Sequence, residues 1–549
     1  MTTGAAVAAV QRILGDPWAA DNPLGLAACL AADERAELPP SGVAAMAEFG
    51  LTAEFVPAHH GGRLRNLART IEVLRAVYRR DPALGLGCGA GPLVAAANVW
   101  TAGSPQQCAR TAKLLLAGGT LAGGSDLTDH GLSAVRSGNS LVLNGVNDIV
   151  ANIEHADAMV VSARTMDTPG TRPYRQLLLH RGELAADRVH DLPRHATVGM
   201  RGVSLGGIRF TECPVPAASP LGGLGDGQRS CQVIRVALPG MMIGILDTAL
   251  RLAVRHARRR ILYGASLAGM PRAEAILSGA FADLLCCDAF CGAAAEALVR
   301  FPGSANRYAA AVKFLVPRML IDATTELSAL LGAAFYVRDG ETGYFQKLVR
   351  DVRAAGLGHE PAISAQLTLL TCLPRSARSG IPAPDELFRS GSDELDFGRL
   401  TLQPDDDDPL IGTLLTAVDR IPRDARELRA LAAWFGDQVD ALAADCRTLP
   451  PNEPGITAGP AALALTTRYA LALGAAACLG RWLADGGDPA WPLLALARLA
   501  RRFTGRLPDL PGLPAAVAAA RSQLGTDAAE RADQDMTFDL ACRDLRSMA

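Results

Sequence analysis

Apolar side chains recur every three or four positions from about residue 5 to residue 115, which is the periodicity of packed helices. Breaks fall at Pro39-Pro40, Gly61-Gly62 and Gly103-Ser104-Pro105, where turn-forming residues interrupt regular structure. The pattern predicts an N-terminal helical domain over residues 1–117.

Between about residues 120 and 215 the pattern changes to short runs of β-branched and aliphatic residues, which Gly, Asn, Asp and Pro separate. The runs are 140–143, 158–162, 176–179, 203–205 and 208–210. Short strands with turn signals at close intervals indicate an all-β segment. We therefore predict a small, mostly antiparallel middle β-domain over residues 118–225.

Long amphipathic patterns then return over 236–260, 272–299 and 306–331. Helices of this length suit a bundle, because each can bury one apolar face along its whole length. We place a helical bundle at residues 226–375, so the expected fold is mainly α with a small β-domain.

Beyond the bundle the chain becomes rich in proline and acidic residues, with four aspartates between Pro404 and Pro409. Proline and like charge disfavour regular structure, so we expect a linker or an irregular surface segment at 376–409. We predict that the remaining residues, 410–549, form a C-terminal helical extension that packs against the main body.

Composition agrees with a globular protein of several units. The chain has 549 residues, of which 49% are hydrophobic and 20% charged, so it has ample apolar material for packed cores. Its net charge of −2 argues against a general nucleic-acid binder, which needs a concentrated positive face. The most apolar late segment, 469–480, is expected to be too short to span a bilayer, so no membrane contact is predicted.

We expect the twelve cysteines to be reduced thiols. None has the paired CxxC spacing of a structural zinc site. The cluster of Cys286, Cys287 and Cys291 lies in an apolar helical pattern, which is typical of buried core thiols. The N-terminus lacks the basic stretch, apolar core and cleavage site of a secretory signal, so we expect a cytoplasmic protein.

Generic motifs do not identify a reaction. Glycine clusters at 85–91 and 221–227 do not follow a predicted strand and open a helix, as a dinucleotide-binding turn requires. The nine histidines show no HExxH pair, and no GxSxG nucleophile turn is present. We therefore expect no metal site.

Six local sequences between about residues 10 and 375 form an ordered set. They are VPAHHGG at 56–62, the pair at 138–152 and 156–164, GMRG at 199–202 with FTECPVP and LGGLGDG at 210–216 and 221–227, Arg235 with Gly240 and Gly244, RILYG at 260–264, and Arg350-Asp351. Together with the predicted domain order, they resemble the acyl-CoA dehydrogenase superfamily, in its long form with a C-terminal helical extension.

This resemblance implies an FAD-dependent enzyme that dehydrogenates an acyl thioester between its α- and β-carbons. In that family a carboxylate removes the α-proton while the β-hydrogen leaves as hydride to the flavin. The implied substrate is an acyl group on coenzyme A or on an acyl-carrier protein, and the implied electron acceptor is a protein or oxygen. A homo-oligomer is also implied, because one subunit completes the flavin site of another.

The resemblance also implies roles for residues near the cofactor. Arg260 would contact the FAD pyrophosphate of a neighbouring subunit, and Tyr263 with Gly264 would pack near the adenosine half. Asn152 and Ala151 would lie along the flavin ring.

Further residues occupy motif positions in altered form. Ile149 stands where the family places tryptophan, and Gly332 stands in the degenerate sequence ALLGA, where the family has Gln-x-x-Gly-Gly. Either Ser125, in Gly124-Ser125-Asp126, or the segment around Thr128 corresponds to the flavin- and substrate-facing opening of the β-domain. Arg235 would line the thioester cleft, and Pro271 replaces a cofactor-binding glutamine.

The base has two candidates. Counting from Arg350-Asp351 places His359 where the family has its glutamate, and one inserted residue would place Glu360 there. A histidine can accept a proton near neutral pH, and a partly buried glutamate can do so as well. Both residues therefore remain candidate catalytic residues.

Two functions follow from these residues. The first is a flavoprotein that dehydrogenates an acyl thioester. The second, suggested by the altered ring wall at Ile149, is a flavin-poor member of the fold that acts as a non-redox thioester enzyme or as a non-catalytic partner subunit.

Overall fold

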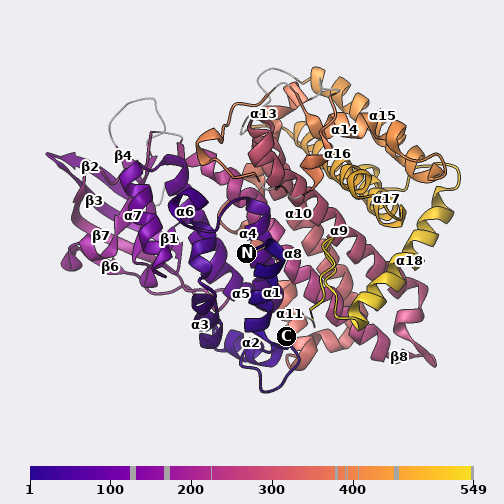
Figure 1. Ribbon diagram of the computed structural model, residues 1–549, viewed down its shortest axis with the longest axis horizontal. Coiled ribbons are helices and arrows are strands. Elements are labelled where there is room, and N and C mark those ends of the chain that lie inside the picture. Colours follow the sequence, from indigo (N-terminus) through magenta and orange to yellow (C-terminus); the bar gives the residue numbers. More distant parts are fainter. Residues whose placement is uncertain are drawn as a thin grey trace. The chain divides into compact units, whose positions relative to one another are not determined.

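The computed structural model describes residues 1–123, 131–165, 174–223, 226–376, 381–389, 391, 393–405, 407–449, 455 and 457–545. Within these ranges the chain forms two compact units (Figure 1). Unit 1 comprises Met1–Ala237 and Ser392–Leu402, and unit 2 comprises Leu238–Gly391 and Gln403–Ala549. Each unit is described by itself below.

The first half of unit 1 is helical, as predicted. Its α-helices are α1 (Thr3–Leu14), α2 (Leu26–Glu34), α3 (Pro40–Phe49), α4 (Leu67–Arg80), α5 (Pro82–Leu84), α6 (Gly91–Ala102) and α7 (Pro105–Leu116). Between them lie two 3₁₀ turns, η1 (Leu51–Phe55) and η2 (Ala58–His60), and one π-helical turn, η3 (Gly85–Ala90). Ser104 starts α7 with a capping box to Gln107, and Pro105 follows at the first helical position.

Helix α4 stabilises this helical part through charged groups as well as apolar ones. Glu54 is fully buried, and Arg69 binds it in a bidentate pair at 2.9 and 3.0 Å, while Arg63 lies 3.1 Å away. Arg80, at the other end of α4, donates to the carbonyl oxygens of Leu14 and Leu24. Leu14 is the last residue of α1, and Leu24 lies just before α2. Arg80 therefore connects α4 to the end of α1 and to the segment that leads into α2.

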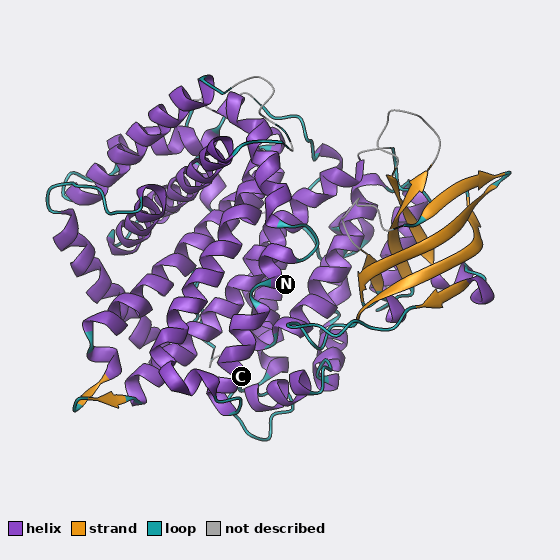
Figure 2. Ribbon diagram, turned by 180° about the vertical axis from the view of Figure 1, so that it is seen from behind, coloured by secondary structure: helices purple, strands orange, loops and turns teal. Residues whose placement is uncertain are grey.

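The second half of unit 1 is a seven-stranded sheet, and the strand direction agrees with the predicted, mostly antiparallel domain (Figure 2). The strands are β1 (Leu121–Gly123), β2 (Ser133–Ser137), β3 (Ser140–Ala151), β4 (Ala158–Thr165), β5 (Tyr174–His180), β6 (Val189–Asp191) and β7 (Leu205–Pro216). Their order is β1-β4-β2-β3-β7-β6, with β5 paired to β4 off this path. Only the β1–β4 and β2–β4 pairs are parallel.

One face of the sheet carries its core, which includes Leu143, Met159, Leu177, Ile208 and Phe210. Strand β3 has register shifts between residues 143 and 145 and between 147 and 150. Such bulges increase local twist, so they bend the end of β3 that carries Ala151. This curvature places the predicted ring-contacting residues at the end of a bent strand.

The described residues of unit 2 form mainly helices, together with one short hairpin. Its helices are the second part of α8 (Asp226–Arg259), α9 (Pro271–Arg300), α10 (Pro302–Leu331), α11 (Gly340–Asp351), α12 (Ala354–Leu357), α13 (Ala362–Ser376), α14 (Pro409–Arg420), α15 (Arg426–Arg447), α16 (Pro460–Asp485), α17 (Ala490–Thr504) and α18 (Leu513–Asp533). The hairpin strands are β8 (Ile261–Leu262) and β9 (Ala265–Ser266).

The three long bundle helices were predicted at the right places, but α8 begins ten residues before the expected start at 236. The expected start was wrong because 226–235 is more polar than the rest of the helix. Prolines at the first helical positions of α9 and α10 end the preceding segments. The C-terminal helices α16, α17 and α18 pack against α9 within unit 2 (Figure 1).

The acidic run contributes a buried group to unit 2. Asp408 is fully buried and accepts hydrogen bonds from the hydroxyl of Tyr308 on α10, at 2.7 Å, and from that of Tyr469 on α16. The fully buried Arg307 lies 3.8 Å from the same carboxylate. Asp408 also caps the N-terminus of α14 through the N–H of Ile411. The described residues from 381 to 405 form the short 3₁₀ turns η9 (Asp385–Phe388) and η10 (Phe397–Arg399) between irregular stretches. Asp408, in contrast, lies in a core rather than on the surface.

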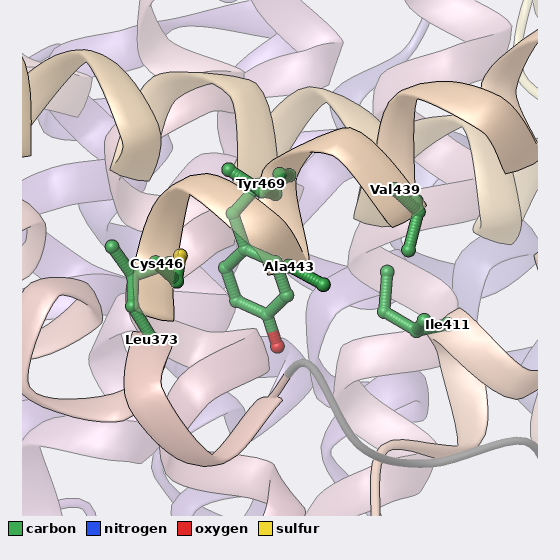
Figure 3. A pocket seen from close by; sticks show the side chains of 7 residues that line it. Leu373, Ile411, Val439, Ala443, Cys446 and Tyr469 are labelled. Atoms are coloured by element: carbon green, nitrogen blue, oxygen red, sulfur yellow. The ribbon is translucent and has the colours of Figure 1, made fainter. Parts of the chain in front are cut away.

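A cavity of only about 10 Å³ lies beside Tyr469. Its lining residues are Leu373, Ile411, Val439, Leu442, Ala443, Cys446 and Tyr469. Figure 3 shows the phenol ring of Tyr469 between Leu373 and Cys446 on one side and Ile411 and Val439 on the other. This volume has room for about one water molecule at most, so α13, α14, α15 and α16 are close-packed here.

A second buried carboxylate, Asp283 of α9, joins the bundle to α17. Arg498 and Arg502 each bind it through two hydrogen bonds between 2.6 and 3.1 Å. Burial alone would raise the pKa of Asp283, but the two guanidinium groups lower it to about 2. The neighbouring thiols of Cys286, Cys287 and Cys291 are buried, which confirms their prediction as core residues.

Among the residues that the structure describes, four helical segments are long and apolar enough to cross a membrane by length and composition. They are Pro82–Ala102, α8, α9 and α16. In each of them, 78–100% of the most apolar stretch is buried inside the protein. The expectation that the apolar segment at 469–480 is too short was wrong, because it belongs to the 26-residue helix α16. Arg468 and Arg481 bound the apolar run, but a single arginine does not end a helix.

We predict that Asp283→Ala lowers the free energy of unfolding by about 3–5 kcal/mol, because it leaves two adjacent arginines without their shared anion. Urea unfolding at neutral pH measures this loss. Glu326→Gln is the matched control: its carboxylate is half exposed and lies 3.3 Å from Arg498, so less than about 1 kcal/mol is expected. Since the folded pKa is depressed, the contribution of Asp283 is complete above pH 3.8 and is lost as the pH falls toward 2. Equal losses in the two variants would contradict this role.

We also predict that Tyr469→Phe lowers stability by about 1–3 kcal/mol, because it removes a donor from a buried carboxylate while keeping the ring. The shift of the thermal midpoint measures the effect. Tyr336→Phe removes a hydroxyl from a side chain that is 85% exposed and should leave the midpoint unchanged. A neutral Tyr469→Phe variant would mean that Asp408 is satisfied without α16.

Candidate functional site

Unit 1 contains a cavity of about 700 Å³, which is in the usual range for small-molecule sites. It lies between the helical part and the sheet. Its apolar lining includes Leu38, Val43, Met46, Leu51 and Leu121, and its polar lining includes Glu37, Thr52, Thr120, Glu154, His155 and Arg194. The cavity can therefore surround an apolar group while offering polar contacts to a ligand.

Two of the predicted ring-contacting residues, Ala151 and Asn152, line this cavity at the end of β3. Asn152 has a φ of 55°, and its backbone N–H donates to the carbonyl of Ser204 at 2.6 Å. Its side-chain Nδ2 donates to the carbonyl of Gly87 at 2.9 Å. These two bonds hold the left-handed residue between the sheet and η3, so the structure places it firmly in the wall.

The glycine cluster at 85–91 forms part of the same wall. Gly87 and Cys88 lie in the π-helical turn η3, where an extra residue widens the helix and frees backbone carbonyls. Burial, with a smaller contribution from Asp81, raises the pKa of the Cys88 thiol to about 12. The thiol therefore stays protonated at neutral pH, and its role in the wall is packing rather than nucleophilic attack.

The predicted phosphate-binding group lies on the β8–β9 hairpin of unit 2. Tyr263 and Gly264 form its two-residue turn with φ values of 52° and 81°, which is the pattern of a type I′ hairpin turn. The side chain of Tyr263 is fully exposed, and that of Ile261 is 60% exposed. An exposed aromatic ring on a left-handed residue costs stability, so it indicates a binding surface rather than a core position.

The arginines before the hairpin have different partners. Arg258 pairs with Asp533, and Arg255 and Arg259 share Glu341 at 2.9 and 3.2 Å. Arg260 is exposed, and the described residues place no carboxylate within ion-pair distance of it. Among the arginines of this run it is therefore the one that offers its guanidinium to an external anion.

The two candidate bases lie together in the loop after α12. The N–H of Glu360 donates to the carbonyl of Gly358 at 2.8 Å across His359, which has a φ of 61°. This is a γ-turn of the rare, strained kind, and a left-handed non-glycine residue costs about 1–3 kcal/mol. Burial, together with the charge of Lys313, lowers the pKa of His359 to about 4.

The ammonium Nζ of Lys313 supports this loop from α10. It donates to the carbonyls of Ala355 and Gly358 at 2.8 and 2.9 Å. The lysine is almost completely buried, with 1% of its surface exposed. The loop therefore contains a neutral imidazole next to a buried cation.

Three predicted site residues share an unusual backbone. Asn152, Tyr263 and His359 are among the few non-glycine residues with positive φ in the described part of the chain. Strained residues of this kind persist where surrounding structure enforces them, and they concentrate at functional sites. The three assignments stay predictions, because residues outside the predicted site, such as Met200 and Glu212, have a positive φ as well.

The other predicted residues lie in separate places. Ile149 is 60% exposed on β3, Arg235 is buried on α8 and does not line the cavity, and Gly332 ends α10 with a φ of 53°. Ser125 and Thr128 fall outside the described residues. The structure thus groups Ala151 with Asn152, Arg260 with Tyr263 and Gly264, and His359 with Glu360.

Sequence reasoning did not identify Lys313, His155 or Arg194, although the structure places each at one of these sites. For Lys313, the rarity of lysine in the sequence was a usable signal, because only three of the 54 basic residues are lysine. His155 and Arg194 lie in loops with no distinctive spacing. Within the described ranges, no three His, Cys, Asp or Glu side chains are grouped closely enough to hold a metal ion.

Known proteins share this fold and parts of this sequence. The family model described as acyl-CoA dehydrogenase, C-terminal domain, matches residues 222–359. Cyclohex-1-ene-1-carbonyl-CoA dehydrogenase of Geobacter metallireducens is 25% identical over 339 residues, which cover 58% of this chain and 86% of that protein. The residues that the family model matches include Arg260 and end at His359.

Solved structures extend the likeness of the fold to 92% of the chain. An acyl-CoA dehydrogenase from Bacillus anthracis, complexed with FAD, superposes with a TM-score of 0.65 at 15% identity and covers 92% of each chain. The prolyl acyl carrier protein oxidase AnaB superposes with a TM-score of 0.59 at 18% identity over 68% of this chain and 98% of its own. Sequence motifs, family model and fold agree, and the chain belongs to the acyl-CoA dehydrogenase superfamily.

Proposed function

We propose that the protein is an FAD-dependent oxidoreductase that dehydrogenates an acyl thioester between its α- and β-carbons. Membership of the superfamily supports this reaction class. The observation that carries it is the neutral His359, held on a strained turn at one of the two positions that the family resemblance predicts for the catalytic base. A base in an enforced conformation is the feature that proton abstraction requires.

The residues present fit FAD at the phosphate end and along the ring. Arg260 has a guanidinium free of carboxylate partners in the described structure, which is the donor that a pyrophosphate binds. The exposed ring of Tyr263 lies three residues away and would pack against the adenosine half. Ile149, Ala151 and Asn152 would hold the flavin ring, and FAD, when bound, supplies the acceptor for the hydride.

The cavity in unit 1 is the proposed site of the acyl group. Its apolar side chains would exclude water from the chain of the substrate, and its polar residues near Thr120 and Arg194 would lie toward the thioester. A volume of about 700 Å³ leaves room for a chain of several carbons or a ring. Arg235, buried outside this lining, would contribute through packing rather than direct contact.

His359 is proposed to remove the α-proton through its unprotonated ring nitrogen. A pKa of about 4 gives this imidazole nearly the proton affinity of an ordinary glutamate, whose pKa is about 4.3. The substitution of histidine for glutamate therefore preserves base strength while removing a negative charge. Glu360 remains the alternative base, because one residue of shift in the loop would exchange the two positions.

The partners follow from the same residues. Arg260 is proposed to serve the flavin of a second copy, so the active protein would be a homo-oligomer. The prolyl acyl carrier protein oxidase with this fold supports a carrier protein as an alternative to coenzyme A. An electron-transferring protein or oxygen would reoxidise the flavin, and the protein is proposed to be cytoplasmic.

A flavin-poor member of the fold is the second candidate, acting as a non-redox thioester enzyme or as a non-catalytic partner subunit. Two observations favour it. Ile149 offers no aromatic plate where the family has tryptophan. Pro271, at the first position of α9, has neither the side-chain amide of the family's glutamine nor a backbone N–H to replace it.

The visible spectrum of the purified protein, after incubation with FAD, tests the choice. We expect flavin absorption that stays with the protein through gel filtration, and Arg260→Ala should weaken FAD binding by about tenfold or more through loss of a charged hydrogen bond. Arg506→Ala, at another exposed arginine, should bind FAD normally. A colourless protein that ignores added FAD would exclude the flavoenzyme and support the second candidate.

Separate alanine variants identify the base. His359→Ala should lower kcat by about 10²–10⁴ with FAD still bound, whereas Glu360→Ala should retain most activity. Since only the neutral imidazole accepts a proton, kcat/KM of the wild type should be constant at neutral pH and fall as the pH drops through about 4. The reverse result for the two variants would assign the base to Glu360, and full activity in both would refute this loop as its source.

A further inference from the structure

Lysine is rare in this chain, and its placement is unusual. Lys113, Lys313 and Lys347 are the only lysines among 54 basic residues. Lys313 and Lys347 are buried, with 1% and 2% of their surface exposed, although lysine is almost never buried in proteins. In a chain that uses arginine nearly everywhere, a buried lysine indicates a position that needs a compact ammonium group.

The position of Lys313 explains that requirement. Helix α12 has only four residues, so its final carbonyls find no partners within the helix. Nζ of Lys313 binds the carbonyl of Ala355 within α12 and that of Gly358 just beyond it. An ammonium group can reach both oxygens at 2.8 and 2.9 Å, whereas a planar guanidinium spreads its donors in a rigid fork.

The carbonyl of Gly358 has a second task, because it also accepts the N–H of Glu360 and so closes the turn around His359. The same oxygen therefore joins the buried lysine to the strained turn. Apolar side chains also lie near this segment: Leu238 is close to Gly358, and Pro317 is close to Gly356. Of the charged groups, Lys313 acts on the imidazole from α10, and Glu360 adjoins it in the chain.

We propose that Lys313 is a positioning residue: by binding the Ala355 and Gly358 carbonyls, its ammonium group fixes the strained turn on which His359 is presented. Its catalytic meaning rests on the proposed function, in which His359 is the base. Lys313 itself moves no proton in the reaction. Its charge has a second effect, because a cation beside the imidazole disfavours imidazolium and keeps the ring in its proton-accepting form.

The first experiment is independent of activity. The full-length protein with ¹³C-labelled histidine is titrated by NMR, and the signal of His359 is identified by its absence from His359→Gln. We expect a midpoint near 4 in the wild type and a rise of about one pH unit or more in Lys313→Met, which lacks the cation. Lys313→Gln serves if the methionine variant does not fold, since it keeps a hydrogen-bond donor without the charge.

Lys347→Met is the matched control. Lys347 is the other buried lysine, and its Nζ lies 2.9 Å from Asp351, which Arg350 also binds. Its loss removes a buried charge of the same kind but none of the bonds to the turn. The His359 midpoint should stay near its wild-type value in this control.

The second experiment separates position from charge in the FAD-loaded enzyme. Lys313→Arg keeps the positive charge but not the geometry of both bonds. We expect its kcat to fall by about tenfold or more while KM changes little, and its His359 midpoint to stay low. A drop in protein stability alone would not produce this combination.

The outcomes are distinct. An unchanged His359 midpoint in Lys313→Met and Lys313→Gln, or an equal rise in Lys347→Met, would overturn the proposal. A wild-type kcat in Lys313→Arg would also overturn it, because geometry would then not matter. If the midpoint shifts as expected but the wild type shows no dehydrogenase activity, Lys313 positions His359 and the proposed function is the part that fails.

Discussion

The buried carboxylate of Asp408 is the interaction on which unit 2 depends. It brings together Tyr308 of α10, Tyr469 of α16 and the start of α14, which are separated by up to 161 residues in sequence. A buried anion without donors would cost several kcal/mol, so none of the three segments can move away without exposing or orphaning it. The C-terminal helices are thus joined to the bundle by a polar requirement as well as by apolar packing.

The same constraint recurs with arginine as the partner. Glu54 in unit 1 and Asp283 in unit 2 are each buried and each bound by two arginines. Guanidinium groups match carboxylates in bidentate geometry. They are more weakly hydrated than an ammonium group, so they lose less hydration free energy when they are buried. An arginine-rich composition therefore suits a fold held by buried carboxylates. At Lys313 the buried cation is an ammonium group instead, and it binds two carbonyls.

The site residues combine strain with support. Asn152 is held by bonds to Ser204 and Gly87, and His359 lies on a turn whose carbonyl binds Lys313. Each strained residue is thus stabilised by a partner from another part of its unit, which is how an unfavourable conformation persists. Tyr263 is the exception, since its ring is fully exposed and the hairpin turn alone holds its backbone. Its support would come from a ligand or a second copy.

The sequence by itself determined the order of helices and strands, the mostly antiparallel sheet, the buried thiols and the family. These features depend on local periodicity and on motifs whose spacing survives in one dimension. The start of α8 was predicted at the wrong residue, because a polar first part of a helix carries little periodic signal. Helical structure was predicted where α16 lies, but its full length was not, because an arginine at each end of its apolar run was taken as a boundary.

Only the tertiary structure decided the chemistry of the site. The low pKa of His359 comes first from its burial and then from the charge of a lysine 46 positions earlier in the chain. The cavity is lined by helices, the turn η3 and the sheet. Asp408 similarly belonged to a run that, by charge and proline content, indicated a surface segment. Burial and electrostatic surroundings arise from contacts between distant residues, and such contacts leave no periodic trace in the sequence.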